Sequence, residues 1–257
     1  MKATQFLPIL LLVSASSTGF AQTSKGDAAA LVGTWTEKTD SALEIKLISP
    51  THVFFFVRNP AIDSFSVAGA GTYTLSGNQY TENLQYGSFD VKGIKATYNY
   101  SAQNNEFKQQ GTLVLADGTQ YPINHTFARV EGATQNSGKQ IGTWNQLSST
   151  FLGDNGAKMS HTNATHIRYQ IITPTHWMRI SLADGKFENA FGGTYTMSGD
   201  KQIIKIDFAS DPSLLGATAE LATKFQGNKM TVSGPVKDAQ GKQVNDITDV
   251  FERVDKK

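Results

Sequence analysis

The chain contains five histidines and no cysteine, so histidine carries most of its potential for metal and acid–base chemistry. His161 and His166 lie five positions apart in the stretch SHTNATHIRYQ. If this stretch is one strand, the two imidazoles point to opposite faces and cannot bind the same ion. No HExxH or other two-histidine helix pattern is present. We therefore predict no metal site.

Covalent catalysis has little support in the sequence. The lack of cysteine excludes thiolate catalysis, disulfides and the acceptor residue of a bacterial lipoprotein. Serine and threonine are abundant, but no GxSxG elbow accompanies a histidine and an acid. We expect a protein without catalysis and without a cofactor. The formal charge of +1 is spread along the chain, so no nucleic-acid partner is expected.

The first residues have the pattern of an export signal. Lys2 precedes an apolar run from Phe6 to Val13, and the small residues around Ala21 suit a signal peptidase. We predict a signal peptide over residues 1–21 and a secreted or periplasmic product. No later stretch reaches the roughly 20 apolar residues of a membrane helix, so integral membrane insertion is not expected.

The chain repeats itself in order. GTYTLSG at residues 71–77 returns as GTYTMSG at 193–199, and GTW at 33–35 returns at 142–144. ISPTH at 48–52 matches ITPTH at 172–176. A tandem duplication explains this shared order. We predict one unit over residues 22–131, a polar linker over 132–139 and a second unit over 140–257.

Within each unit, apolar and polar residues alternate between Gly, Asn and Asp turns. This pattern is typical of antiparallel strands and hairpins. Residues 211–225 could instead form a helix that starts at Asp211-Pro212, but the first copy has strand alternation at the same place. We expect a strand over 218–225, with at most a short helical turn before Gly216.

Each copy opens with G-x-W and closes with F-x-R-V, at residues 127–130 and 251–254. These motifs, together with ITPTHW and FGGTYTMSGD, resemble the bacterial secreted lipocalin-like (calycin) β-barrel domains. The resemblance implies an all-β fold of two tandem antiparallel lipocalin-like β-barrels. It also implies that a tryptophan lies across the closed end of each barrel under an arginine. The barrel-closure residues are then Trp35 with Arg129 and Trp144 with Arg253.

A comparison of the copies predicts which side chains face the lumen, because alternate residues of a barrel strand point inward. After the shared histidine, every second side chain, beginning with Phe54 and Met178, is apolar in both copies. The side chains between them, which include Phe55 and Trp177, have no property common to both copies. We assign the first set to the lumen and the second to an outer face or an inter-barrel contact. The predicted lumen residues are His52, Phe54, Phe56, Tyr73, Tyr80, Glu82, His176, Met178, Ile180 and Tyr195.

An apolar lumen with a few polar points suits a small apolar or amphipathic ligand, bound without catalysis. The same aromatic residues could instead be the packed core of a narrow barrel, and His52 and His176 could be hydrogen-bonded residues of its rim. Filled barrels would make the chain a protein-interaction module, with Phe55 and Trp177 as exposed contacts. The resemblance leaves two further options open, a calycin-type isomerase or hydratase, and a haem binder that uses His52 or His176. The ligand's identity and the oligomeric state do not follow from the sequence.

Overall fold

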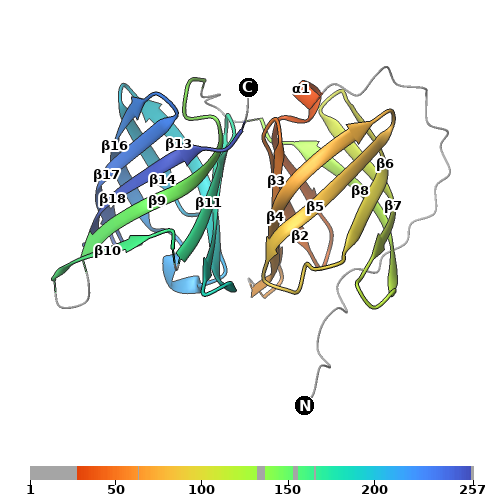
Figure 1. Cartoon of the computed structure of the whole chain (residues 1–257), viewed down its shortest axis with the longest axis horizontal. Helices are drawn as coiled ribbons and strands as arrows, with labels where there is room; N and C mark the ends of the chain where they lie inside the picture. The colour runs from red at the N-terminus through yellow and green to blue at the C-terminus, as the bar shows by residue number, and fades with distance from the viewer. Residues whose placement is uncertain (1–27, 63, 132–136, 153–155, 165, 256–257) are drawn as a thin grey trace, which may run out of the picture.

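The structure is a computed structural model that describes residues 28–62, 64–131, 137–152, 156–164 and 166–255. The predicted signal peptide and residues 132–136 of the predicted linker lie outside these ranges. The described residues form two antiparallel β-barrels that stand side by side (Figure 1). Their strands fall within the two halves expected from the repeat. Of the helices in the described ranges, none has the length and hydrophobicity needed to cross a membrane.

The first barrel is one closed ring of eight strands that pair in sequence order. A short helix, α1 (Ala28–Leu31), precedes it. The ring closes where β1 meets β8 at Trp35–Arg129 and Thr36–Ala128. The strands are β1 (Gly33–Lys38), β2 (Leu43–Ile48), β3 (His52–Asn59), β4 (Ser64–Ser76), β5 (Gln79–Gly87), β6 (Lys95–Gln103), β7 (Glu106–Val114) and β8 (Gln120–Arg129).

The second barrel repeats this order and closes where β9 meets β18. Two short strands lie outside the ring path: β10, which pairs with β9, and β15, which pairs with β13. The strands are β9 (Gly142–Leu152), β10 (Lys158–Thr162), β11 (His166–Ile172), β12 (His176–Ala183), β13 (Lys186–Ser198), β14 (Lys201–Lys205), β15 (Phe208–Ala209), β16 (Thr218–Gln226), β17 (Lys229–Lys237) and β18 (Gln243–Arg253).

The ambiguous stretch after Asp211 is resolved as expected. Only a 3₁₀ turn, η1 (Pro212–Leu214), forms there, and the Asp211 side chain accepts the Ser213 N–H at its start. Residues 218–226 then form β16, which pairs with β14 and β17. The prediction of a strand is confirmed.

The two closed ends share one construction. The Arg129 guanidinium carbon lies 4.1 Å from the centroid of the Trp35 ring, and the Arg253 carbon lies 4.2 Å from that of Trp144. These two predicted contacts are confirmed. The first residue of G-x-W is also explained, because a Cβ on Gly33 would lie 2.6 Å from an Arg129 nitrogen and its φ is +146°. The glycine gives the arginine room to reach the tryptophan.

An apolar layer joins the barrels. It is formed by β2, β3 and β4 of the first barrel and by β11, β12, β13 and β15 of the second. The rings of Phe56 and Phe208 lie 4.9 Å apart across it, and those of Tyr86 and Tyr169 are stacked at 4.9 Å. The buried residues of this inter-barrel layer are Ile45, Leu47, Phe54, Phe56, Ala68, Ala70, Ile171, Met178, Ile180, Ala190 and Phe208.

This layer corrects the predicted parity of β3 and β12. Phe54, Phe56, Met178 and Ile180 were assigned to the lumens, but they pack between the barrels. Their neighbours of opposite parity, such as Val53 and Trp177, lie in the cores of the barrels. The reason is symmetry: both copies contribute the same apolar face to the layer, so shared apolar character marks the contact and not the lumen.

The edge of the layer shows the same two-fold relation in polar groups. The Thr34 hydroxyl is 2.7 Å from that of Thr173, and the Thr143 hydroxyl is 2.8 Å from that of Ser49. These two pairs exchange equivalent positions of the copies. The barrels therefore face each other much as the subunits of a symmetric dimer do.

Candidate ligand-binding interiors

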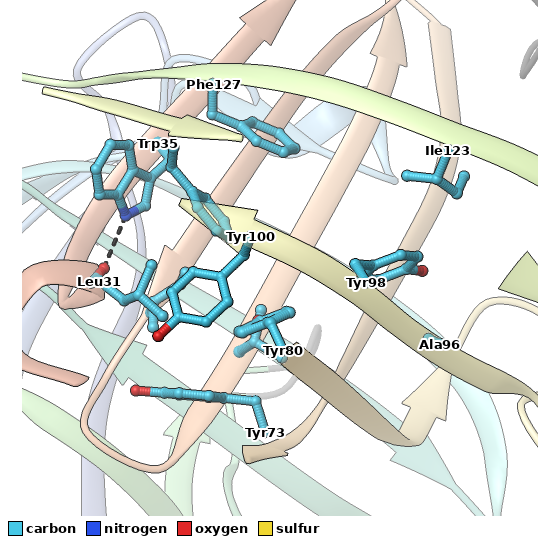
Figure 2. Packing of buried hydrophobic residues seen from close by; sticks show 12 residues of the cluster. Leu31, Trp35, Tyr73, Tyr80, Ala96, Tyr98, Tyr100, Ile123 and Phe127 are labelled. Atoms are coloured by element: carbon cyan, nitrogen blue, oxygen red, sulfur yellow. Dashed lines mark hydrogen bonds between the residues drawn. The ribbon is translucent and has the colours of Figure 1, made fainter. Parts of the chain in front are cut away.

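Aromatic rings fill the closed half of the first barrel (Figure 2). The Trp35 indole N–H donates to the Leu31 carbonyl at 2.7 Å, which holds the ring across the barrel end. Tyr73 and Tyr80 stack at 5.3 Å, and Phe107 lies 5.7 Å from Tyr80. The prediction that Tyr73 points inward is confirmed, and Tyr80 is completely buried beside it.

A charged network crosses the middle of the first barrel. The Lys46 ammonium donates to Glu82 at 3.0 Å and to the Gln109 side-chain oxygen at 2.7 Å, and it lies 3.6 Å from Glu44. Burial opposes the charge on Lys46, but Glu82 and Glu44 outweigh it and raise its pKa. Glu82 was predicted to face the lumen, and it does so as a buried partner of Lys46.

Glu37, Glu44 and His125 form the one described group of side chains able to supply three metal ligands, with ligand atoms within 4.8 Å of one another. The sequence did not reveal this group, because Glu37 and His125 come from opposite ends of the unit and meet only where β1 closes on β8. His125 hydrogen-bonds to Glu37, which also accepts the Thr126 N–H at 2.8 Å. Glu44 already faces the Lys46 ammonium. The arrangement therefore supports the barrel closure more directly than it supports a cation.

The second barrel has different interior chemistry. Arg179 donates to Gln170 at 3.1 Å and to the buried Asp249 carboxylate at 3.0 Å. Arg168 donates to the Gln146 side-chain oxygen at 3.3 Å. Burial is the main cause that lowers the pKa of Arg168, followed by Arg179, yet an arginine remains charged in proteins. Two guanidinium groups thus share this interior with one fully buried carboxylate.

Three buried donors in the described part of the second barrel have no hydrogen-bond partner. They are the side-chain amide nitrogen of Gln146, the indole nitrogen of Trp177 and Nε of Arg179. Gln146 is 3% exposed and Trp177 is 2% exposed. A buried donor without a partner costs about 1–3 kcal/mol, so such groups mark a place for water or a ligand.

A small surface pocket includes Gln146 and Arg168 in its lining, but not Trp177 or Arg179, and it has no room for a water-sized sphere. The His161 and His166 rings stack there at 4.3 Å. The prediction that these histidines point apart is wrong, because β10 and β11 are separate strands and the chain turns between them. Burial is the main cause that lowers the pKa of His161, with His166 and Arg168 contributing.

His52 and His176 do not face the lumens. The His52 Nδ1 contacts the Thr51 hydroxyl at 2.7 Å and the Asp255 carboxylate at 3.3 Å, at the junction of the barrels. The hydroxyl and the carboxylate meet the same ring nitrogen, so the group lacks the relay geometry of a catalytic triad. His176 contacts Thr175 in the same way at 2.9 Å. A lumenal haem ligand at either histidine does not fit this geometry.

The remaining predicted residues divide between the two interiors. Tyr195 faces the second core, as expected, and its hydroxyl donates to the Thr173 carbonyl at 2.8 Å. Burial raises the pKa of Tyr195 to about 12. Phe55 and Trp177, offered as exposed contacts for an interaction module, are buried inside the barrels, so that assignment is wrong.

An open groove of about 370 Å³ lies between the barrels. Its apolar side chains come from both halves, and Leu182 is the most deeply buried of them. They are Tyr86, Phe89, Val91, Leu182 and Phe187.

No protein-family model matches the chain, and no curated protein matches it significantly. A solved structure of a protein of unknown function from the DUF3598 family of Nostoc punctiforme aligns with 90% of this chain and 100% of its own. Its identity is 14% and its TM-score is 0.26. The DNA polymerase III beta chain of Streptococcus pneumoniae aligns with 92% of this chain and 60% of its own, at 10% identity and a TM-score of 0.15. These likenesses carry no functional argument.

Proposed function

We propose that this chain is an exported, non-catalytic lipocalin-like protein whose second barrel binds a small amphipathic molecule, while its first barrel is a filled scaffold. The observation that carries this proposal is the difference between the two interiors. The export signal rests on the sequence alone.

The interior rings of the first barrel are largely absent from the second. The strand register shows which residues of the two barrels are equivalent. Tyr80 pairs with Tyr98 on the neighbouring strand of the first barrel, and Gln202 pairs with Leu221 in the same way in the second. Trp177, Phe191 and Phe225 return part of the lost volume, because the first barrel has Val53, Gly69 and Ala102 at the equivalent positions. In order, Tyr80, Tyr98, Tyr100 and Phe107 correspond to Gln202, Leu221, Thr223 and Met230.

The second interior also has the composition that suits an amphipathic guest. Its walls include apolar residues such as Leu221, Met230 and Val232, and its polar groups gather around Arg179. Apolar walls contribute roughly 25 cal/mol per Å² of buried area, and a few polar groups fix the orientation of a ligand. In the first barrel the interior charge is Lys46, which pairs with Glu82 and Gln109.

Refilling the second barrel tests this proposal. We expect the wild-type protein to take up the dye ANS and to release it to dodecanol or dodecanoate. Thr223→Tyr restores a tyrosine of the first barrel and should abolish uptake, whereas Tyr100→Thr, the reverse exchange in the first barrel, should leave uptake by the second barrel intact. Folding of both variants is checked by circular dichroism. Equal uptake by wild type and Thr223→Tyr, or no uptake by the wild type, would overturn the proposal.

A second candidate function is favoured by the groove between the barrels, whose apolar lining suits a protein segment. In that case both barrels would be spacers. The dye experiment separates the two functions, because a groove site responds to Phe187→Glu and not to Thr223→Tyr.

A further inference from the structure

The three unpaired donors of the second barrel lie in one part of its interior. The Phe191 ring lies near two of these residues: its centroid is 5.6 Å from the Trp177 ring and 5.8 Å from the Arg179 guanidinium carbon. Phe251 links the third, because it lies 5.4 Å from the same carbon and is the β18 partner of Gln146.

All three unpaired groups are donors, and the charge around them is positive. Arg168 and Arg179 share this region with one fully buried carboxylate, Asp249, which accepts from Arg179. Glu188 is 4.0 Å from Arg168 and its side chain is about one-third exposed, so water screens it. One unpaired acceptor, the Asn189 side-chain oxygen, is also buried on the neighbouring strand β13.

The chemistry that satisfies unpaired donors in a positive interior is an oxyanion. A carboxylate has two oxygens and about four lone-pair positions, which is enough for three donors. Hydrogen bonds between such donors and a charged acceptor are also stronger than those to neutral water. The pocket lined by Gln146 and Arg168 gives this part of the barrel a side facing solvent.

We propose that Gln146, Trp177 and Arg179 form an oxyanion site that holds the carboxylate of the amphipathic molecule bound by the second barrel. This inference rests on the proposed function and adds to it the chemical class of the ligand and the atoms that recognise it.

The first barrel shows what the interior is like without this site. Glu37, Val53 and Phe55 stand at the positions equivalent to Gln146, Trp177 and Arg179. None of them offers a side-chain N–H, and Glu37 is already bound to His125 and the Thr126 N–H. The donors are therefore specific to the second copy.

Two conservative substitutions test the site. Gln146→Glu keeps the oxygen that accepts from Arg168 but replaces the unpaired donor with a negative charge, and Trp177→Phe removes only the indole N–H. Gln109→Glu is the matched control, since it adds a carboxylate to the other barrel beside Lys46. Binding of dodecanoate, dodecanol and inorganic phosphate is measured by titration calorimetry on the full chain.

We expect dodecanoate to bind wild type at least tenfold more tightly than dodecanol does, because hydrogen bonds from these donors to a charged carboxylate are stronger than those to a neutral hydroxyl. Gln146→Glu should weaken dodecanoate at least about tenfold and Trp177→Phe about threefold to tenfold, with dodecanol unchanged. Gln109→Glu should change neither. If Gln146→Glu does not fold, Trp177→Phe decides alone.

The outcomes separate this inference from the proposed function. Equal affinity for dodecanoate and dodecanol, with no effect of Trp177→Phe, would overturn the oxyanion site and leave a lumenal binding protein. Lack of binding by either amphiphile would overturn both. Tight binding of inorganic phosphate alone would show an oxyanion site whose ligand is a free anion, and would overturn the assignment to an amphiphile's carboxylate.

Discussion

The two barrels have the same closed end and opposite interiors. Each places an arginine about 4 Å from its first tryptophan, yet one interior holds a lysine among glutamates and the other holds two arginines around an aspartate. The exterior faces that form the inter-barrel layer are apolar in both. A duplicated domain thus keeps what holds the pair together and varies what each barrel encloses.

The seams, where the first and last strands of each barrel meet, also differ between the two barrels. Strands β1 and β8 share two paired positions, whereas β9 and β18 share six. In the first barrel the Glu37 side chain bridges to β8 through Thr126 and His125, where the second has further backbone pairing. The closure of the first barrel therefore depends more on interior side chains than the closure of the second barrel does.

The largest effect is expected from a charge in the inter-barrel layer. Phe56→Asp buries an unpaired carboxylate against Phe208 and loses the aromatic contact, which together cost more than about 5 kcal/mol. Because each barrel is a closed sheet, we expect the barrels to separate on their linker, with a larger radius of gyration in X-ray scattering. Ile62→Asp, at a position 72% exposed, is the control. An unchanged radius would place Phe56 outside the contact.

The next effect is specific to the first barrel. Lys46→Met leaves the Glu82 carboxylate buried without its partner, which should cost about 3–5 kcal/mol. Adding Glu82→Ile, the residue type of the second copy, should recover most of this loss. Hydrogen exchange read by mass spectrometry should show faster exchange in first-barrel peptides only. Gln170→Met, the equivalent change in the second barrel, should cost about 1 kcal/mol; a similar loss in both barrels would contradict the comparison.

The closed ends should respond alike. Arg129→Met removes two hydrogen bonds to the Val32 and Ala30 carbonyls and the contact with Trp35, at a cost of about 2–3 kcal/mol. Arg253→Met removes the equivalent contacts and should cost the same within about 1 kcal/mol. Urea unfolding followed by hydrogen exchange in each half measures both values. A markedly unequal cost would mean that the two ends are not equivalent supports.

The smallest effect concerns Asp255, which lies where the barrels meet. Burial opposes its ionisation, but hydrogen bonds from His52, Thr51, the Thr143 N–H and Ser49 outweigh this and lower its pKa below the usual 3.8. A depressed pKa adds stability above about pH 4 that is lost as the pH falls further. Asp255→Asn should therefore cost about 1 kcal/mol near pH 7, and this cost should shrink as the pH falls below about 4, as measured by urea unfolding.

Glu131→Gln is the control for Asp255, because Glu131 is the equivalent exposed residue of the first copy. It should be neutral at either pH. A cost of Asp255→Asn that does not shrink below about pH 4 would show that the side chain acts through packing rather than charge.

The sequence predicted the fold and the closed ends because these depend on local patterns. Alternation and hairpin turns identify antiparallel strands, and the repeated G-x-W and F-x-R-V identify the tryptophan and arginine that meet. Tyr73 and Tyr195 were placed correctly for the same reason, since threonine and tyrosine alternate around them and only one face is apolar.

Alternation could not predict which face of β3 and β12 points into the lumen. Both faces of these strands are buried, one inside a barrel and one against the other barrel, so alternation does not distinguish them. Comparison of the copies then favoured Phe54 and Met178, because the contact is shared while the lumens have diverged. Trp177 and Arg179 lie on the face of β12 whose residue types differ between the two copies. That difference between the copies was the sequence feature that could have identified them as lumen residues.

The most direct test of the account is a crystal structure of the full chain with dodecanoate. The account predicts density for the amphiphile inside the second barrel, with its carboxylate on Gln146, Trp177 and Arg179, and a first barrel filled only by its own side chains. Density for dodecanoate in the first barrel, or in the groove beside Phe187 with water alone on the three donors, would contradict it.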